Sequence, residues 1–290
     1  MGEAESGQYA VGYFESWNLE SLLAVADAAT AMRSPVILGF SGIHLPFTEQ
    51  GLDERLRLYA ELGNECCRQL PVPACLLFNE SPYFDWVMKS IDLGFGLVMF
   101  TDESLNPIDQ QDKVRRLVEK AHAAGVAVEG EIMPLPGVNG QISVLPGDLR
   151  LTEPSLARLF VKQTGIDALA VNIGQAHVHG RSELPLDLSR LAELRQAFSI
   201  PLVLHGATSI DRRHLQQSIL LGIRKINVGS ILKRVFFEAV RSSCAKVGSD
   251  YNPYDVVGSG LTSDVLAAGR DAMRRTVEEL MGWFGSAGKA

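Results

Sequence analysis

The sequence lacks the features that mark membrane, secreted and nucleic-acid-binding proteins. No apolar stretch reaches the roughly 18 residues that a membrane-spanning helix needs, and residues 1–8, MGEAESGQ, have neither the basic nor the apolar region of a signal peptide. Positive charge is scarce, because 27 lysine and arginine residues stand against 34 acidic residues and the formal net charge is −7. Non-specific binding to nucleic acid or to a membrane surface needs a basic surface, so we expect a small-molecule partner and neither nucleic acid nor membrane.

Paired cysteines and internal boundaries are missing as well. The four cysteines Cys66, Cys67, Cys75 and Cys244 do not have the paired spacing of a metal site, which indicates free thiols in a cytoplasmic protein. No low-complexity segment or charge run divides the 290 residues. Because α/β barrels of about 250 residues fold as single units, residues 1–290 are expected to form one domain.

Eight short apolar runs have the length and composition of buried strands. In chain order they are Tyr9 to Phe14, Pro35 to Phe40, Val72 to Phe78, Gly96 to Phe100, Val126 to Glu131, Ala168 to Ile173, Pro201 to Leu204 and Arg224 to Asn227. Helical stretches such as Leu19 to Met32 and Leu52 to Gln69 lie between them. This alternation indicates a parallel sheet with right-handed crossovers, and eight such units close a (β/α)8 TIM barrel.

A doubly wound open sheet is the alternative fold, but the residues that follow the strands favour the barrel. Polar or small residues follow nearly every strand, and in a barrel all βα loops share one face. These residues are Glu15, Ser41, Asn79 and Glu80, Thr101 to Glu103, Glu129 and Glu131, Asn172 with His177 and His179, His205 with Gly206, and Asn227 to Ser230. We therefore expect them to converge on one mouth of the barrel.

Two of these strand ends have the character of phosphate-binding loops. Small residues let backbone N–H groups approach an anion, and a helix N-terminus adds a favourable dipole. In barrels such a site typically follows strands seven and eight. The candidate phosphate-binding residues are Gly206, Thr208, Ser209, Asn227, Gly229 and Ser230. The structural alternative is that Ser230 only caps a helix and that Gly206 only turns a loop.

The histidines suggest a metal site. His177 and His205 follow strands six and seven, so their side chains can meet over the barrel axis. Two imidazoles and a carboxylate are a common ligand set of catalytic zinc. A lone histidine is more often a hydrogen-bonded structural residue, and we leave His122 and His214 with that interpretation.

Motifs spread along the chain carry a resemblance to a known family. They include Tyr9-Ala10-Val11-Gly12, Val128-Glu129-Gly130-Glu131, Ile173-Gly174-Gln175-Ala176-His177, Leu202-Val203-Leu204-His205-Gly206, Lys225-Ile226-Asn227 and the tail from Phe284 to Ala290. With them the chain resembles the class II, metal-dependent ketose-bisphosphate aldolases of the fructose- and tagatose-bisphosphate type. The resemblance implies that zinc polarises a ketose carbonyl and that an aspartate in a His-x-Asp-His motif moves the proton of the C4 hydroxyl.

The chain departs from this pattern at the motif itself, which reads Leu77-Phe78-Asn79-Glu80. Asn79 stands where the family has its aspartate, and an amide cannot trade a proton near neutral pH. Glu80 stands where the family has a metal-binding histidine. A carboxylate is an acceptable ligand, so the expected metal ligands are Glu80, His177 and His205, with Zn2+ as the first expectation and Fe2+ or Mn2+ as alternatives.

Further departures concern the acids and the loop after strand six. Phe14-Glu15 replaces the family's Phe-Asn, and Thr101-Asp102-Glu103 replaces its Asp-Gly-Ser. Glu15, Glu80 or Glu103 is therefore a candidate replacement proton carrier, the alternative being that Glu15 and Glu103 face solvent. The candidate catalytic residues are Asn79, Glu80 and Glu131. Gly180 is the candidate for the family's phosphate-binding glycine, and His179 competes with His177 as metal ligand.

Three functions fit these residues. The first is a metal-dependent lyase of aldolase type that acts on a phosphorylated ketose or related sugar. The second is an epimerase or isomerase on the same scaffold, and the third is a non-catalytic sugar-phosphate binder. The resemblance also implies a homodimer or homotetramer, with the helix predicted from Asp264 to Trp283 as a candidate packing surface.

Overall fold

Eight parallel strands close a barrel in the order in which they occur along the chain. The computed structural model describes residues 1–43, 52–132, 135, 151–176 and 185–290. The strands are β1 (Val11–Ser16), β2 (Val36–Ser41), β3 (Ala74–Ser81), β4 (Leu97–Phe100), β5 (Ala127–Glu131), β6 (Ala168–Ala170), β7 (Leu202–Leu204) and β8 (Ile223–Val228). The predicted (β/α)8 TIM barrel is thus confirmed, and it forms a single domain.

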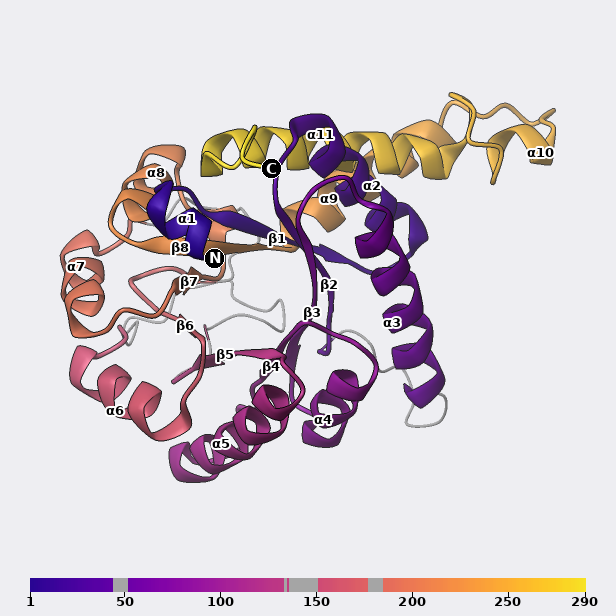
Figure 1. Ribbon diagram of the computed structural model, residues 1–290. Helices are drawn as coiled ribbons and strands as arrows, with labels where there is room; N and C mark the ends of the chain where they lie inside the picture. The colour runs from indigo at the N-terminus through magenta and orange to yellow at the C-terminus, as the bar shows by residue number, and fades with distance from the viewer. Residues whose placement is uncertain (44–51, 133–134, 136–150, 177–184) are drawn as a thin grey trace.

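The helices surround the barrel (Figure 1). They are α1 (Gly2–Ser6), α2 (Leu19–Met32), α3 (Leu52–Gln69), α4 (Phe84–Asp92), α5 (Pro107–Ala123), α6 (Pro154–Thr164), α7 (Leu188–Ala197), the 3-10 helix η1 (Ala207–Ser209), α8 (Arg212–Leu220), α9 (Ser230–Cys244), α10 (Pro253–Val256) and α11 (Val265–Phe284). The bounds of α2 and α3 are those predicted from the sequence. Asn18 and Ser21 form a reciprocal capping box that fixes the start of α2.

Strand β6 is shorter than the predicted run from Ala168 to Ile173. The reason is local, because side chains take the backbone N–H groups that a longer strand would need. Asn172 N donates to Thr152 Oγ1 at 2.7 Å, and Ile173 N donates to Gln175 Oε1 at 2.8 Å. The strand therefore ends at Ala170.

Side chains alternate between the barrel interior and the helix layer along each strand. Near the amino ends of the strands the interior is apolar, and Tyr13, Ile37, Leu77 and Leu97 pack together there. Ala4 of α1 is fully buried against this cluster. Nearer the carboxyl ends the inward-facing positions become polar, so the chemistry of the molecule lies at that end of the barrel.

Helix α11 packs along α2 and α9 of the same chain. Its residues Met273, Val277 and Met281 are fully buried, so much of the predicted packing surface is covered within the chain. Self-association therefore stays a prediction. In Figure 1, α10 lies at the end of an arm that projects from the barrel beyond α2, and its Tyr254 is 84% exposed.

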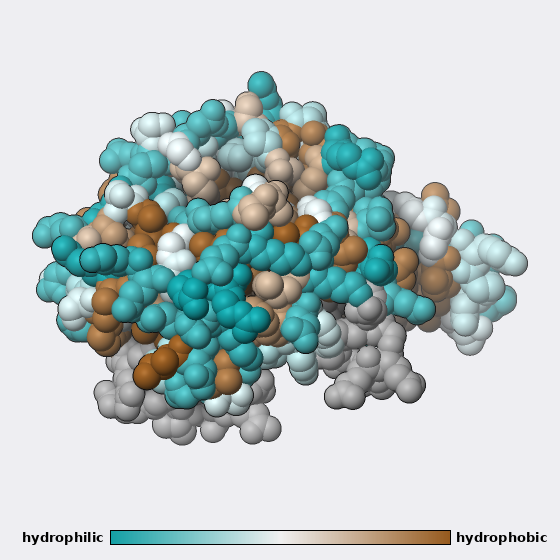
Figure 2. Space-filling view, turned by 60° about the horizontal axis from the view of Figure 1, so that its bottom comes forward, coloured by the Kyte–Doolittle hydropathy of each residue, from teal (hydrophilic) through white to brown (hydrophobic). Residues whose placement is uncertain are grey.

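On the face shown in Figure 2, hydrophilic residues cover most of the surface, with hydrophobic residues scattered among them. This distribution is expected of amphipathic helices that bury one face against a barrel. Within the described parts of the chain, none of the helices combines the length and the apolar character that crossing a bilayer requires.

Candidate active site

The polar layer at the carboxyl ends of the strands brings most of the described candidate residues together. Asn79 and Glu80 come from β3, Glu131 from β5, His205 from the end of β7 and Asn227 from β8. All five are buried or nearly so. Since five residues from four different segments meet at one mouth, the expected convergence of the strand ends is observed for the residues that the structure describes.

A backbone irregularity turns Glu80 into the mouth. Successive residues of a regular strand point to opposite faces, yet Asn79 Nδ2 donates a hydrogen bond to Glu80 Oε2 at 2.6 Å. Glu80 has a φ of 47°, in the left-handed region, and the pairing of β3 with β4 shifts register between Phe78 and Ser81. A bulge of this kind re-aims a side chain, and its strained conformation is typical of functional sites.

His205 is held between two carboxylates. Its Nδ1 lies 3.1 Å from Glu80 Oε1 and its Nε2 lies 2.8 Å from Glu129 Oε1. Burial alone would lower the pKa of the imidazole, but Glu80 and Glu129 together raise it to about 10. Each ring nitrogen of His205 therefore faces the oxygen of one carboxylate.

A buried lysine completes the layer beneath His205. Lys225 Nζ forms an ion pair with Glu129 Oε2 at 2.7 Å and donates to Asn227 Oδ1 at 2.5 Å. The Asn227 amide nitrogen in turn lies 2.9 Å from His205 Nε2. Although burial opposes ionisation of Glu129, Lys225 and His205 outweigh it and lower the pKa of this carboxyl. These partners favour the ionised form of Glu129, which fixes the orientation of His205.

Glu131 has different surroundings from Glu129, although both point into the barrel from β5. Burial, followed by the neighbouring charges of Glu80 and Glu129, raises its pKa to about 7, while His205 and Thr101 act in the opposite direction. The Thr101 hydroxyl donates to Glu131 Oε1 at 2.5 Å and fixes the carboxyl group. A carboxyl with this pKa can gain and lose a proton near neutral pH.

The predicted metal site is only partly within the described residues. Glu80 and His205 are in contact, and their 3.1 Å separation is close to the distance of about 3.4 Å between two ligand atoms of tetrahedral zinc. Glu129 on the second ring nitrogen supplies the carboxylate that commonly supports a metal-binding histidine. His177 lies outside the described residues, as does His179. In the part that is described, no three His, Cys, Asp or Glu side chains form a metal-binding group, but the donors present fit two ligands of one.

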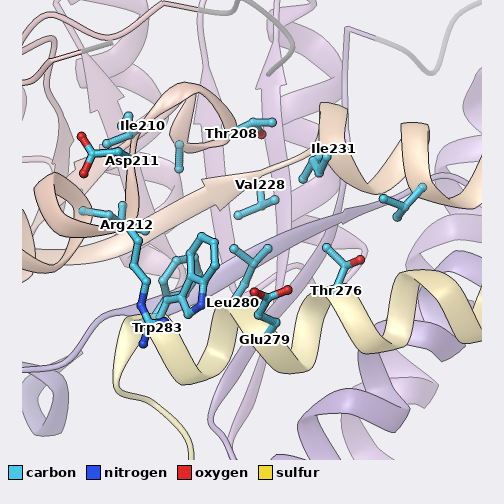
Figure 3. Close-up of a pocket in the computed structure, with 14 residues that line it drawn as sticks. Thr208, Ile210, Asp211, Arg212, Val228, Ile231, Thr276, Glu279, Leu280 and Trp283 are labelled. Carbon is cyan, nitrogen blue, oxygen red and sulfur yellow. The ribbon is translucent and has the colours of Figure 1, made fainter. Parts of the chain in front are cut away.

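The two predicted phosphate segments lie at the ends of β7 and β8. Gly206 adopts a left-handed conformation with a φ of 65°, and Ala207 to Ser209 then form η1. Thr208 lines a cavity of about 710 Å3 between α8, α9 and α11, where Figure 3 shows it near Ile231. Ser230 begins α9 and Gly229 precedes it. Gly180 lies outside the described residues, and phosphate binding by these segments stays a prediction.

Other polar residues have structural partners, as expected for two of them. His122 pairs with Asp167 at 2.9 Å and His214 pairs with Asp211. Glu103 is exposed in the turn after β4, in line with the alternative that it faces solvent. Glu15 instead is buried and forms an ion pair with Lys233 Nζ at 2.7 Å.

Sequence reasoning missed Lys225 and Lys233 as members of the site. For Lys225 a signal exists, because a lysine two residues before Asn227 in a buried strand must face the same side as that asparagine. Lys233 lies one turn into a helix, and nothing in the sequence indicates that it reaches back to the end of the first strand.

A closed barrel with acid–base residues at the carboxyl ends of its strands defines the class of barrel enzymes, and comparison with known proteins identifies the family. The model of the family described as class II fructose-bisphosphate aldolase matches residues 1–289. The chain therefore belongs to the class II fructose-bisphosphate aldolase family, which places it among the aldolase-type lyases of carbohydrate metabolism.

Solved structures agree with this assignment. The YdjI aldolase from Escherichia coli K12 is 26% identical and aligns with a TM-score of 0.80 over 100% of this chain and 96% of its own. The fructose-bisphosphate aldolase Fba from Campylobacter jejuni is 19% identical and aligns with a TM-score of 0.81 over 100% and 94% of the two chains. At that lower identity the likeness supports the fold alone.

Proposed function

We propose that the protein is a metal-dependent aldolase-type lyase that acts on a phosphorylated ketose or a related sugar. The observation that supports this most directly is the position of His205, which is held between Glu80 and Glu129 at the mouth of the barrel. A buried carboxylate behind an imidazole, and a second carboxylate in front of it, is the arrangement that a metal site needs.

The metal ligands in this proposal are Glu80, His205 and His177. When bound, a divalent cation supplies Lewis acidity that polarises the ketose carbonyl. Zinc suits this donor set, and the carboxylate ligand also suits Fe2+ or Mn2+. Glu129 and Lys225 do not touch the substrate in this proposal. They keep the His205 ring oriented, because Glu129 binds one ring nitrogen and is itself anchored by the Lys225 ammonium.

Proton transfer falls to Glu131, since Asn79 cannot exchange a proton near neutral pH. Glu131 is buried in the same mouth, its carboxyl group is fixed by Thr101, and its pKa of about 7 suits both acceptance and return of a proton. In the direction of cleavage we assign it to accept the proton of the hydroxyl group whose carbon becomes the aldehyde. Asn79 has a positioning role, because its amide holds Glu80 at 2.6 Å.

The test is the metal content of Glu80→Ala. Protein purified without chelator should contain about one divalent metal ion per chain by elemental mass spectrometry, and it should release an aldehyde from at least one member of a panel of ketose phosphates. Glu80→Ala should lose both properties while its circular dichroism spectrum stays unchanged. Glu103→Ala removes an exposed carboxylate from the same rim and should keep both.

The outcomes separate the alternatives. Metal content that Glu80→Ala leaves unchanged would contradict the ligand assignment. Exchange of substrate hydrogen with solvent, without cleavage of a carbon–carbon bond, would indicate an epimerase or isomerase. Sugar-phosphate binding without metal or turnover would indicate a non-catalytic binder.

A further inference from the structure

The end of the first strand carries a charge that the reaction proposed above does not use. Glu15 faces the mouth from β1, because it lies two residues after the inward-facing Tyr13 and so shares its face of the strand. The residue is only 9% exposed. Because a buried carboxylate needs partners, the groups that contact Glu15 indicate its role.

Two contacts hold the Glu15 side chain. Its Oε1 lies 2.7 Å from Lys233 Nζ, and the same ammonium group lies 5.8 Å from the centre of the Trp17 ring. The other oxygen, Oε2, lies against the backbone of Gly229, so closely that a Cβ atom built on this residue would overlap it. A side chain at position 229 would therefore have to displace the carboxylate end of Glu15.

The pairing of β1 with β8 produces this contact. Phe14 is in register with Val228, so the next residues of the two strands, Glu15 and Gly229, leave the sheet side by side. Gly229 also directly precedes α9, and it has no side chain with which to cap that helix. The Glu15 carboxylate thus brings its negative charge to the positive end of the α9 dipole.

The carboxylate therefore lies at the segment from Asn227 to Ser230, which was predicted to bind phosphate. A phosphate group placed there would meet the negative charge of Glu15 at short range, and the Lys233 ammonium is already paired with that carboxylate. A neutral hydroxyl group can instead donate a hydrogen bond to the carboxylate.

We propose that Glu15, held by Lys233 against Gly229, is a specificity-determining residue that excludes phosphate from the β8–α9 side of the mouth and selects a substrate with an uncharged, hydroxylated group there. The inference rests on the proposed function, because it concerns which part of a sugar phosphate enters this side of the mouth. It leaves the segment that follows β7 as the phosphate-binding segment.

The experiment measures binding of inorganic phosphate by titration calorimetry, which requires no turnover. Glu15→Gln keeps the shape of the side chain and removes its charge, so it should bind inorganic phosphate at least tenfold more tightly than the wild type. The matched control is Glu103→Gln, which makes the same change of net charge at an exposed position in the turn after β4. It should bind phosphate as the wild type does.

A double variant locates the added binding. Glu15→Gln with Lys233→Met should lose the gain, because the freed ammonium group is the expected phosphate partner. Retention of the gain in the double variant, an equal gain in Glu103→Gln, or no gain in Glu15→Gln would each overturn the inference. Glu15→Asn, measured in parallel, provides the same charge change should Glu15→Gln fail to fold.

Failure of this inference can be told apart from failure of the proposed function. If the wild type cleaves no ketose phosphate but Glu15→Gln gains phosphate affinity through Lys233, the specificity inference stands and the lyase assignment fails. If the wild type cleaves a ketose phosphate and Glu15→Gln gains nothing, the lyase assignment stands and Glu15 has no role in selecting charge.

Discussion

Lys225 is the buried counter-ion of Glu129 in the barrel interior. Its side chain is 1% exposed and that of Glu129 is 0% exposed, so their ion pair is separated from solvent. A buried pair need not stabilise a protein relative to an apolar pair, but removal of one partner leaves an uncompensated charge. Lys225 thereby also keeps Glu129 ionised and, through it, holds His205 in place.

Lys225→Met should therefore destabilise the protein strongly. Loss of one partner of a buried ion pair costs about 3–5 kcal/mol, which chemical denaturation followed by circular dichroism would detect. Lys120→Met is the matched control, because it makes the same change in an ion pair with Asp92 whose two side chains are 34% and 63% exposed. A partly exposed pair contributes about 0–1 kcal/mol, so equal losses in the two variants would contradict this account.

The sequence predicts site residues well where a position at the end of a strand is enough to place the side chain at the mouth. Glu131, His205 and Asn227 lie at or just after the ends of strands and were expected at the mouth for that reason. Glu80 was expected as a ligand by resemblance, but its left-handed backbone and the bulge that turns it inward are products of the β3–β4 pairing. The Glu15–Lys233 contact joins residues 218 positions apart, and no local pattern predicts it.

At the scale of the helices and strands, the ends of α11 illustrate what local sequence determines. The helix was expected from Asp264 to Trp283 and extends from Val265 to Phe284, with Asp264 as its N-cap. Asp264 Oδ1 accepts a hydrogen bond from Leu266 N and Oδ2 accepts one from Gly260 N, both at 2.9 Å. Such caps lie within a few residues of the helix that they stabilise, which is why the sequence reveals them.

Asp264→Ala should lower the free energy of unfolding by about 1 kcal/mol at neutral pH, because it removes this cap. Burial of Asp264 opposes ionisation, but backbone N–H groups led by that of Gly260 outweigh it and lower the pKa of the carboxyl. A group with a lowered pKa in the folded state stabilises the protein above its unfolded pKa and loses that contribution as pH falls through the folded value.

The difference between wild type and Asp264→Ala should therefore shrink below about pH 4, near the ordinary aspartate value of 3.8. Denaturation midpoints at several pH values would measure it. Asp264→Asn provides a control, because asparagine caps helices as well as aspartate does but does not titrate. A wild-type advantage over Asp264→Ala that persists unchanged at pH 3 would contradict the assignment.

Strand bounds were less predictable than helix bounds, for a physical reason. The predicted strand from Ala168 to Ile173 ends early because Thr152 and Gln175 capture backbone N–H groups. Thr152 is about 20 residues away in sequence, and a competition of this kind depends on the folded arrangement. The order of elements and the closed barrel, in contrast, follow from eight repeated units that all require burial of the same apolar runs.

At the scale of the whole molecule, two distant segments meet at the amino-terminal face of the barrel. Glu5 of α1 forms ion pairs with Arg195 and, at 2.9 Å, with Arg224. The segment after α11 returns to the end of α2, where the Ser34 hydroxyl donates to Ser286 Oγ at 2.8 Å and both residues are fully buried. These contacts cover the end of the barrel opposite to the site.

Deletion of residues 286–290 should lower the stability of the whole barrel without changing the mouth. Besides the bond to Ser34, this segment donates backbone hydrogen bonds from Gly288 to Met32 O at 2.9 Å and from Ala290 to Arg33 O at 3.0 Å. Three hydrogen bonds at about 1 kcal/mol each predict a loss of about 2–4 kcal/mol, visible as a lower denaturation midpoint. Ser286→Ala should lose about a third of this amount.

Since the segment lies at the opposite end from Glu80 and His205, the metal content of the truncated protein should equal that of the full chain. Loss of metal at unchanged stability would show that the two ends of the barrel are coupled, which the packed apolar interior between them argues against.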